Sequence, residues 1–237
     1  MTRPHPSNGA GVPPLFIVLE GIDGSGTTTQ LERLAQHLRD RGRPALATRE
    51  PSEGPVGRLL REALLGHHRD ARGAPIDGRA MALLFAADRR DHLVREIEPA
   101  LAAGTDVVSD RYLLSSLAYQ AVEADRLWVQ RLAEGVRVPD LTLVLDLPTG
   151  VAAERRRRAG RVDERYDADA TLIRVAENYR RLAGGGREPV AVPGDELPLG
   201  PVVLLDATST VEDVARAIAA EVDRLVDGHT TRRESSR

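Results

Sequence analysis

The sequence predicts an α/β fold built around a parallel β-sheet, and three observations support this prediction. Short apolar runs alternate with longer segments of helical periodicity, which is typical of parallel α/β sheets. Glycines follow several of the helical segments, where a left-handed residue commonly ends a helix. The first apolar run leads through a glycine-rich loop into a helical segment. The 237 residues suit a single domain with its own hydrophobic core.

Five apolar runs are predicted to be the strands of one sheet. They are short, rich in Val, Ile and Leu, and each is followed by a charged residue. The runs are residues 15–19, 45–48, 106–109, 141–145 and 202–205. Because helical segments separate most of them, we expect the strands to lie parallel.

The segments between and after these runs are predicted to be helices. In the first of them, Leu31, Leu34, Ala35 and Leu38 recur at helical spacing. The segments are residues 30–41, 56–65, 77–103, 113–134, 151–158, 170–182 and 211–225. The sequence has no internal repeat and no credible second domain. We therefore divide the chain into a flexible N-terminal extension (1–14), one domain (15–228) and a flexible polar tail (229–237).

The composition narrows the classes of function. The absence of cysteine excludes disulfides, thiolate metal sites and cysteine nucleophiles. A net charge of −3 gives no overall attraction to nucleic acid or to anionic membranes, so neither is expected as a partner. No apolar stretch approaches the roughly 20 residues needed to cross a bilayer. We therefore expect a cytoplasmic location.

The loop after the first predicted strand matches the phosphate-binding pattern G-x-x-x-x-G-K-[ST] at every position but one. Its glycines allow close approach of the backbone, and the amides at the start of the following helix favour an anion. This context, a strand followed by the loop and a helix, predicts binding of nucleotide phosphates. The loop consists of Gly21, Ile22, Asp23, Gly24, Ser25, Gly26, Thr27 and Thr28.

Thr27 stands where the pattern has lysine. Threonine has a hydroxyl but no charge, so it cannot stabilise the β- and γ-phosphates as an ammonium group does. The chain contains no lysine at all, so all 33 residues counted as lysine or arginine are arginine. Two interpretations remain open: an arginine compensates for the missing lysine, or the catalytic site is weakened.

Charged residues follow the predicted strands, at the edge of the sheet where ligands bind in such folds. Glu20 follows the first strand, residues 49–50 the second, Asp110-Arg111 the third and Asp146 the fourth. Asp110 is placed to hold Mg²⁺ together with the Thr28 hydroxyl, because hard cations prefer oxygen ligands. We therefore predict a phosphate and magnesium site at this edge.

Several of these segments together resemble bacterial thymidylate kinase. The matching pieces are Glu-Gly-Ile-Asp-Gly-Ser-Gly at 20–26, Thr-Arg-Glu-Pro at 48–51, Leu-Leu-Phe-Ala-Ala-Asp-Arg at 83–89, Asp-Arg-Tyr-Leu-Leu-Ser-Ser-Leu-Ala-Tyr-Gln at 110–120 and the segment 139–146. The resemblance implies a P-loop nucleoside monophosphate kinase fold with a five-stranded parallel sheet and a lid. It also implies transfer of the γ-phosphate of ATP to dTMP, and a homodimer.

The resemblance implies a role for each residue of the acceptor site. Phe85 would stack on the thymine ring, and Arg89, Ser116 and Gln120 would hydrogen-bond the edge of the base. The dTMP phosphate would be bound by Arg49 and Arg111, whose planar guanidinium groups can each contact two oxygens. Asp23 would face the 3′-hydroxyl of the sugar, close to the metal.

The predicted lid spans about 154–168 and contains four consecutive arginines followed by Gly160. In the family, members with glycine after the loop acid tend to place a catalytic arginine in the lid, and Gly24 fits this subtype. Arg158, Arg161 and Arg165 have spacings compatible with one side of the segment, so they are the candidate catalytic arginines alongside Arg111. Which of them would act stays open.

Three functions are consistent with these residues. The first is an active Mg²⁺-dependent dTMP kinase in which lid arginine partly replaces the loop lysine. The second is a nucleotide-binding protein with weak or lost kinase activity, because Thr27 is uncharged. The third is a kinase for another pyrimidine monophosphate, such as dUMP or CMP, which the pocket residues Phe85, Arg89, Ser116 and Gln120 make less favoured.

Overall fold

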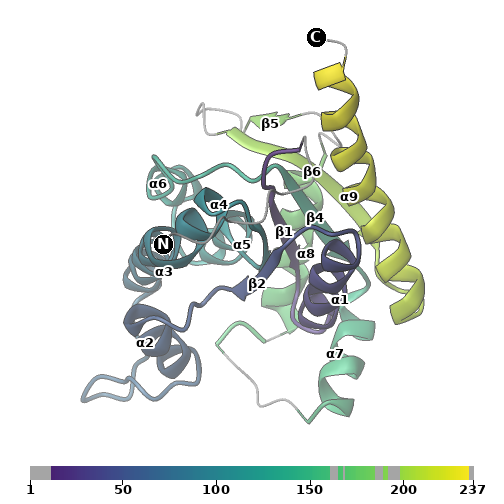
Figure 1. Cartoon of the computed structure of the whole chain (residues 1–237). Coiled ribbons are helices and arrows are strands. Elements are labelled where there is room, and N and C mark those ends of the chain that lie inside the picture. The colour runs from purple at the N-terminus through teal and green to yellow at the C-terminus, as the bar shows by residue number, and fades with distance from the viewer. Residues whose placement is uncertain (1–11, 161–164, 168, 185–188, 192–197, 235–237) are drawn as a thin grey trace.

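The computed structural model describes residues 12–160, 165–167, 169–184, 189–191 and 198–234. Its centre is a six-stranded sheet in the order β2-β3-β1-β4-β6-β5 (Figure 1). The strands are β1 (Phe16–Gly21), β2 (Ala45–Arg49), β3 (Asp106–Asp110), β4 (Leu141–Asp146), β5 (Pro189–Ala191) and β6 (Pro198–Asp206). All pairs are parallel except that between β5 and β6. The predicted five-stranded parallel sheet is confirmed, and β5 adds a short antiparallel edge that the sequence analysis missed.

Helices cover both faces of this sheet. On one side, α1 (Thr27–Asp40) and α9 (Val211–Glu234) lie side by side, and on the other side lie α5 (Leu113–Tyr119) and α8 (Asp169–Leu182) (Figure 1). The remaining elements are α2 (Pro55–Leu64), α3 (Gly78–His92), the π-helical turn η1 (Leu93–Ile97), α4 (Glu98–Ala102), the 3₁₀ turn η2 (Gln120–Val122), α6 (Arg126–Arg131) and α7 (Thr149–Arg158).

The prediction of a single helix over residues 113–134 is wrong. The chain leaves the helical path after η2, and Asp125 then caps a new helix by accepting a hydrogen bond from the backbone N–H of Trp128 at 2.9 Å. Aspartate competes with helical backbone for hydrogen bonds, so it favours such a start over a helix interior. At the C-terminus, α9 continues to Glu234, beyond residue 228 where the sequence analysis placed the end of the domain. The predicted N-terminal extension lies largely outside the described residues.

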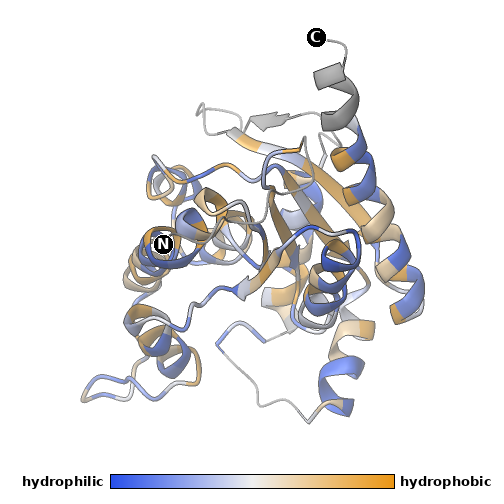
Figure 2. Ribbon diagram, viewed as in Figure 1, coloured by the Kyte–Doolittle hydropathy of each residue, from blue (hydrophilic) through white to orange (hydrophobic). Residues whose placement is uncertain are grey.

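The hydrophobic core lies between the sheet and its helices. Every residue of β1 is buried, and the predicted face of α1, formed by Leu31, Leu34, Ala35 and Leu38, is buried as well. Figure 2 shows the corresponding pattern, with hydrophobic colouring along the strands and hydrophilic colouring on the outer surfaces of the helices. Each fully buried leucine stabilises the fold by about 1.5–3 kcal/mol relative to an exposed one. In the described part of the chain, no helix is both long enough and apolar enough to span a membrane.

The order of the strands determines where the charged residues meet. β1 lies between β3 and β4, with Leu19 beside Asp110 and Gly21 beside Leu145. β2 pairs with the far side of β3, and Arg49 lies beside Asp110. The carboxyl ends of these strands therefore bring the glycine-rich loop, Arg49 and Asp110 to one edge of the sheet, where open α/β sheets bind ligands.

Candidate active site

The glycine-rich loop connects β1 to α1 and adopts a conformation that requires glycine. Gly24 has a φ of 91°, and a Cβ atom at this position would lie 2.4 Å from the carbonyl oxygen of Ala152 in α7. Gly26 has a φ of 97° and is the N-cap of α1, where no side chain caps the first amides. These amides and the positive end of the helix dipole are thus left to bind an anion, which fits a phosphate.

Thr28, the last residue of this loop, lies in contact with Asp110. The Thr28 hydroxyl donates a hydrogen bond to Asp110 Oδ2 at 2.7 Å, while the buried Asp110 Oδ1 has no hydrogen-bond partner among the described residues. A buried carboxylate oxygen without a partner is unfavourable unless a cation or water satisfies it. Two oxygen ligands beside a phosphate-binding loop fit Mg²⁺, which is usually held by one or two side chains together with substrate phosphates and water.

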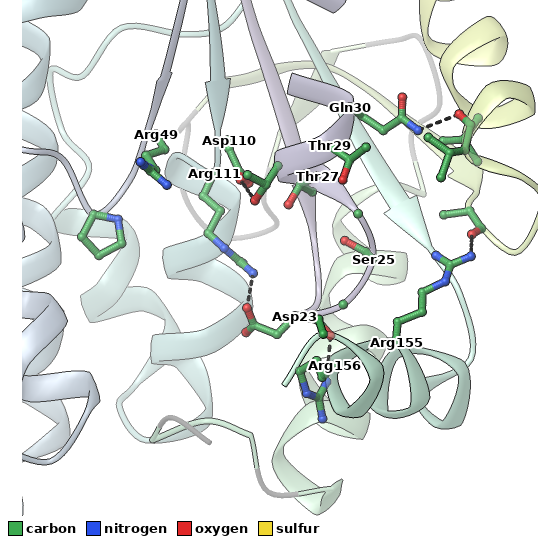
Figure 3. Close-up of a pocket in the computed structure, with 18 of the residues that line it drawn as sticks. Asp23, Ser25, Thr27, Thr29, Gln30, Arg49, Asp110, Arg111, Arg155 and Arg156 are labelled. Carbon is green, nitrogen blue, oxygen red and sulfur yellow. Dashed lines mark hydrogen bonds and ion pairs between the residues drawn. The ribbon is translucent and has the colours of Figure 1, made fainter. Parts of the chain in front are cut away.

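A cleft of about 610 Å³ extends from the loop in two directions (Figure 3). One end reaches the connection between β6 and α9, where Ala207, Ser209 and Val211 line it. The other end reaches α2. The arginines that line it come from β2, α2, the residue after β3, and α7, and are Arg49, Arg61, Arg111, Arg155 and Arg156. The cleft therefore has five guanidinium groups against three carboxylates, those of Asp23, Glu53 and Asp110, although the loop itself lacks lysine.

Arg111 follows β3 and is the only described non-glycine residue with a positive φ, 71°. Its guanidinium group donates to the carbonyl oxygen of Gly21 at 3.0 Å and to Asp23 Oδ1 at 3.1 Å, and lies 5.1 Å from the centre of the Tyr119 ring. Burial opposes its charged form, but Tyr119 and Asp23 raise the pKa of Arg111 above its ordinary value. Figure 3 shows the side chain reaching from β3 towards the loop.

A second, smaller pocket adjoins the cleft. The two cavities share Asp23, Pro51, Leu64 and Arg111 as lining residues. The second pocket is otherwise lined by Phe85, Ser115, Tyr119, Gln120, Tyr166 and Asp167. The structure thus brings the predicted acceptor residues Phe85 and Gln120 next to the predicted phosphate residues Asp23 and Arg111.

Arg89 and Ser116 lie behind this pocket rather than in its lining. Arg89 is 2% exposed and donates to Ser116 Oγ at 2.6 Å, so these two predicted residues contact each other. Its Nε also lies 3.2 Å from Glu50 Oε2, a buried ion pair that the sequence analysis did not assign. Glu50 is the third residue of the segment Thr48-Arg49-Glu50-Pro51, but no sequence pattern indicated that Arg89 is its partner.

Arg49 lies at the mouth of the cleft, 3.5 Å from Glu53.

Comparison with known proteins decides which family this arrangement represents. The family model described as "Thymidylate kinase" matches residues 19–192. The chain belongs to the thymidylate kinase family. It is 47% identical over 180 residues to the thymidylate kinase of Synechococcus sp. strain WH7803, covering 71% of this chain and 82% of the relative. The thymidylate kinase of Thermomicrobium roseum is 39% identical over 207 residues, covering 85% and 96%, and the probable thymidylate kinase of Thermococcus kodakarensis is 44% identical over 173 residues, covering 71% and 84%.

The lid arginines of this thymidylate kinase family member lie differently from the prediction. Arg158 is 78% exposed and pairs with Glu154 at 2.8 Å, and Arg165 pairs with Glu123 at 3.0 Å, so neither lines the cleft. Arg161 lies outside the described residues. Of the three candidate lid arginines, the two that the structure describes therefore lie away from the cleft, and their catalytic role stays a prediction.

Arg155 and Arg156, three and two residues before Arg158 on α7, line the cleft instead (Figure 3). Arg155 donates to the carbonyl oxygen of Ala207 at 2.9 Å, and Arg156 donates to that of Asp23 at 2.7 Å. Spacing alone could not select these two, because four consecutive arginines point in all directions around a helix. The choice depends on how α7 packs against the loop near Gly24, which is a tertiary contact.

Proposed function

We propose that this chain transfers the γ-phosphate of ATP to dTMP, giving dTDP. Membership of the thymidylate kinase family supports this activity. The observation that carries the assignment of residues is the shared wall of the two cavities. Asp23 and Arg111 line both the cleft at the glycine-rich loop and the pocket that contains Phe85 and Gln120. A donor nucleotide in the first and an acceptor nucleotide in the second would present their phosphates to each other.

The donor phosphates are bound by the amides of residues 21–28 and by the start of α1. Thr28 and Asp110 would hold Mg²⁺, which when bound neutralises charge on the phosphate oxygens. Arg155 and Arg156 add positive charge on the side of the loop that faces α7. We assign the missing charge of the loop lysine to this group of arginines, together with Arg111.

The acceptor base occupies the pocket lined by Phe85 and Gln120. The aromatic ring of Phe85 provides a flat apolar surface for a pyrimidine. The buried Oε1 atom of Gln120 has no partner among the described residues and would accept a hydrogen bond from the imide N–H of thymine. Arg89 and Ser116 form the polar layer behind this pocket, and Arg49 and Arg111 bind the dTMP phosphate.

Catalysis follows from positioning and charge stabilisation. Holding the acceptor phosphate oxygen in line with the γ-phosphate removes much of the entropic cost of the reaction, and fixed guanidinium groups stabilise the charge that spreads over the transferred group. Asp23 orients Arg111 through their ion pair at 3.1 Å. No covalent intermediate with the protein is needed.

The experiment that tests this function measures product formation from a panel of acceptors. Purified protein with ATP and Mg²⁺ should convert dTMP to dTDP, with a higher kcat/KM for dTMP than for dUMP or CMP. The methyl group of thymine alone is worth about 10-fold or more in an apolar pocket. A higher kcat/KM for CMP or for a purine monophosphate would contradict the assignment of the acceptor pocket.

Replacing Thr27 with lysine should change kcat by less than about tenfold, because the cleft already contains several guanidinium groups. If the loss of the loop lysine were not compensated, it would cost about 10²–10³ in kcat, as removal of other transition-state donors does. Steady-state kinetics with saturating dTMP give this comparison, and Thr29→Lys at the neighbouring position is the control for an added charge. A hundredfold gain for Thr27→Lys alone would show that the arginines do not compensate.

The homodimer and the cytoplasmic location also remain proposals. Large apolar side chains are exposed on α3, η1 and α6, namely Leu83, Val94 and Leu127. Burial of such side chains against a second copy would remove them from water, which supports a dimer. Light scattering of the purified protein would measure the oligomeric state.

A further inference from the structure

Residues 165–167 include two lining residues of the acceptor pocket, and the segment is attached to four separate parts of the chain. The backbone N–H of Arg165 donates to the carbonyl oxygen of Leu64 at the end of α2, at 3.1 Å. The Arg165 guanidinium donates to the carbonyl oxygen of Ile76 at 2.6 Å. The third attachment is to Glu123, at the end of η2. The fourth is an ion pair between Asp167 Oδ1 and Arg156 Nε of α7, at 3.5 Å. A residue predicted to be catalytic is therefore used here to fix a segment of backbone.

Glu123 accepts hydrogen bonds from two residues of this segment, Arg165 and Tyr166. Its Oε2 atom accepts hydrogen bonds from Arg165 Nη2 at 3.0 Å and Nε at 3.2 Å, and from the Tyr166 hydroxyl at 3.2 Å. The side chains of Arg165 and Glu123 are 13% and 32% exposed. An isolated ion pair at the surface contributes about 0–1 kcal/mol, whereas a charge with several aligned donors in a partly buried setting is held more firmly.

The residues next to Arg165 form part of the pocket. Tyr166 and Asp167 line it, and the Tyr166 ring packs edge-on against Tyr119 with ring centres 5.6 Å apart. Burial raises the pKa of Tyr166 to about 12, so its hydroxyl stays protonated and can donate to Glu123. Gln120 lines the same pocket. A change at Glu123 would therefore be transmitted to the wall around the acceptor base.

The position of Glu123 is itself constrained by packing. A Cβ atom added at Gly78, the first residue of α3, would lie 2.7 Å from Glu123 Cβ. Glu123 thus packs closely against the start of the helix that carries Phe85. The same residue contacts both the segment over the pocket and the helix that forms its base-binding side.

We propose that Glu123 is a positioning residue for the acceptor nucleotide: it anchors residues 165–167 through Arg165 and Tyr166 and so closes the pocket over the base. This inference rests on the proposed function of that pocket. Glu123 touches no reacting atom, so its removal affects acceptor binding far more than the transfer step.

Steady-state kinetics of Glu123→Ala and Glu123→Gln test the proposal in the full-length protein. Glu123→Ala should raise KM for dTMP about tenfold, the equivalent of about one hydrogen bond to a charged group, and leave KM for ATP and kcat within about twofold. Glu123→Gln, which keeps an acceptor oxygen, should have a smaller effect. The matched control is Glu134→Gln, since Glu134 is exposed and forms no side-chain hydrogen bond or ion pair within the described residues. Equal changes in both KM values, or an unchanged KM for dTMP, would overturn the proposal.

A double-mutant cycle with Arg165→Met identifies the route by which Glu123 acts. If the carboxylate works through Arg165, the double variant should have nearly the same KM for dTMP as the worse single variant. Additive effects of the two substitutions would contradict this coupling. A fall in kcat for Arg165→Met without a rise in KM for dTMP would return Arg165 to a catalytic role and overturn the anchoring role.

Hydrogen exchange separates this inference from the proposed activity. The amide of Arg165 is bonded to Leu64, so its exchange should become about tenfold faster in Glu123→Ala if the anchor is lost, and stay unchanged in Glu134→Gln. If the wild-type protein failed to phosphorylate dTMP but showed this faster exchange, the anchor would stand and the assigned substrate would fail. Unchanged exchange in an active enzyme would refute the anchor alone.

Discussion

Replacing Arg111 with methionine should lower kcat/KM for dTMP by about a thousandfold or more, because this single guanidinium serves both the acceptor phosphate and the transferred group. Its contacts with the Gly21 carbonyl and with Asp23 hold it rigidly at the wall shared by the two cavities. Methionine is similar in length but has no charge and no donor. The substitution would also leave the Asp23 carboxylate without its ion pair with Arg111, which adds unfavourable negative charge near the phosphates.

Two further variants make the Arg111 prediction specific. Arg111→Lys keeps the charge but loses the planar fork, so its kcat/KM should lie between those of the wild type and Arg111→Met. Arg131→Met is the control for loss of an arginine, because Arg131 is exposed on α6 and lines neither cavity. Thermal unfolding of each variant separates loss of function from loss of fold. A kcat/KM of Arg111→Met within tenfold of the wild type would remove Arg111 from the reaction.

Replacing Gly24 with alanine should weaken ATP binding about a hundredfold or more, through two steric effects. The φ of 91° is unfavourable for alanine, costing about 1–2 kcal/mol. In addition, the new methyl group would lie 2.4 Å from the carbonyl oxygen of Ala152, which is backbone and cannot rotate away. The loop or α7 must shift, and the amides that bind the phosphates would then be misplaced.

Gly42→Ala isolates the first of these two effects. Gly42 has a φ of 75° but no atom within 4 Å of an added Cβ, and it lies outside the cleft. Its substitution should lower stability by about 1 kcal/mol without changing the affinity for ATP. Titration calorimetry with a non-hydrolysable ATP analogue measures both variants. An unaltered dissociation constant for Gly24→Ala would mean that the loop tolerates displacement.

The elements that could be predicted from the sequence are those whose signals are local. The buried face of α1 follows from the spacing of Leu31, Leu34 and Leu38, and the parallel strands follow from short apolar runs separated by helices. The break between α5 and α6 was missed because the apolar pattern continues across it, although Asp125 is a capping residue. Strand β5 was missed because it is short, begins with Pro189 and lies at the edge of the sheet.

The candidate site also contains residues that could be placed from the sequence and residues that could not. The loop, Asp110 and Arg111 could be placed because motif and strand order bring them to one edge. Phe85, on α3, was predicted only from the resemblance to thymidylate kinase. The arginines of α7 could not be placed, because the side that faces the loop depends on the contact between Gly24 and Ala152. The contact between Glu123 and Arg165 could not be predicted either, because the two residues are 42 positions apart and share no motif.

The basic side chains that line the cleft are all arginine, with neither lysine nor histidine among them in the described part of the chain. A guanidinium group keeps its proton at any physiological pH. The positive charge that these side chains bring to the cleft should therefore stay constant between mildly acidic and mildly alkaline conditions. Any change of rate across this interval then reports mainly on ionisation of the nucleotides, whose terminal phosphates lose their last proton near pH 6.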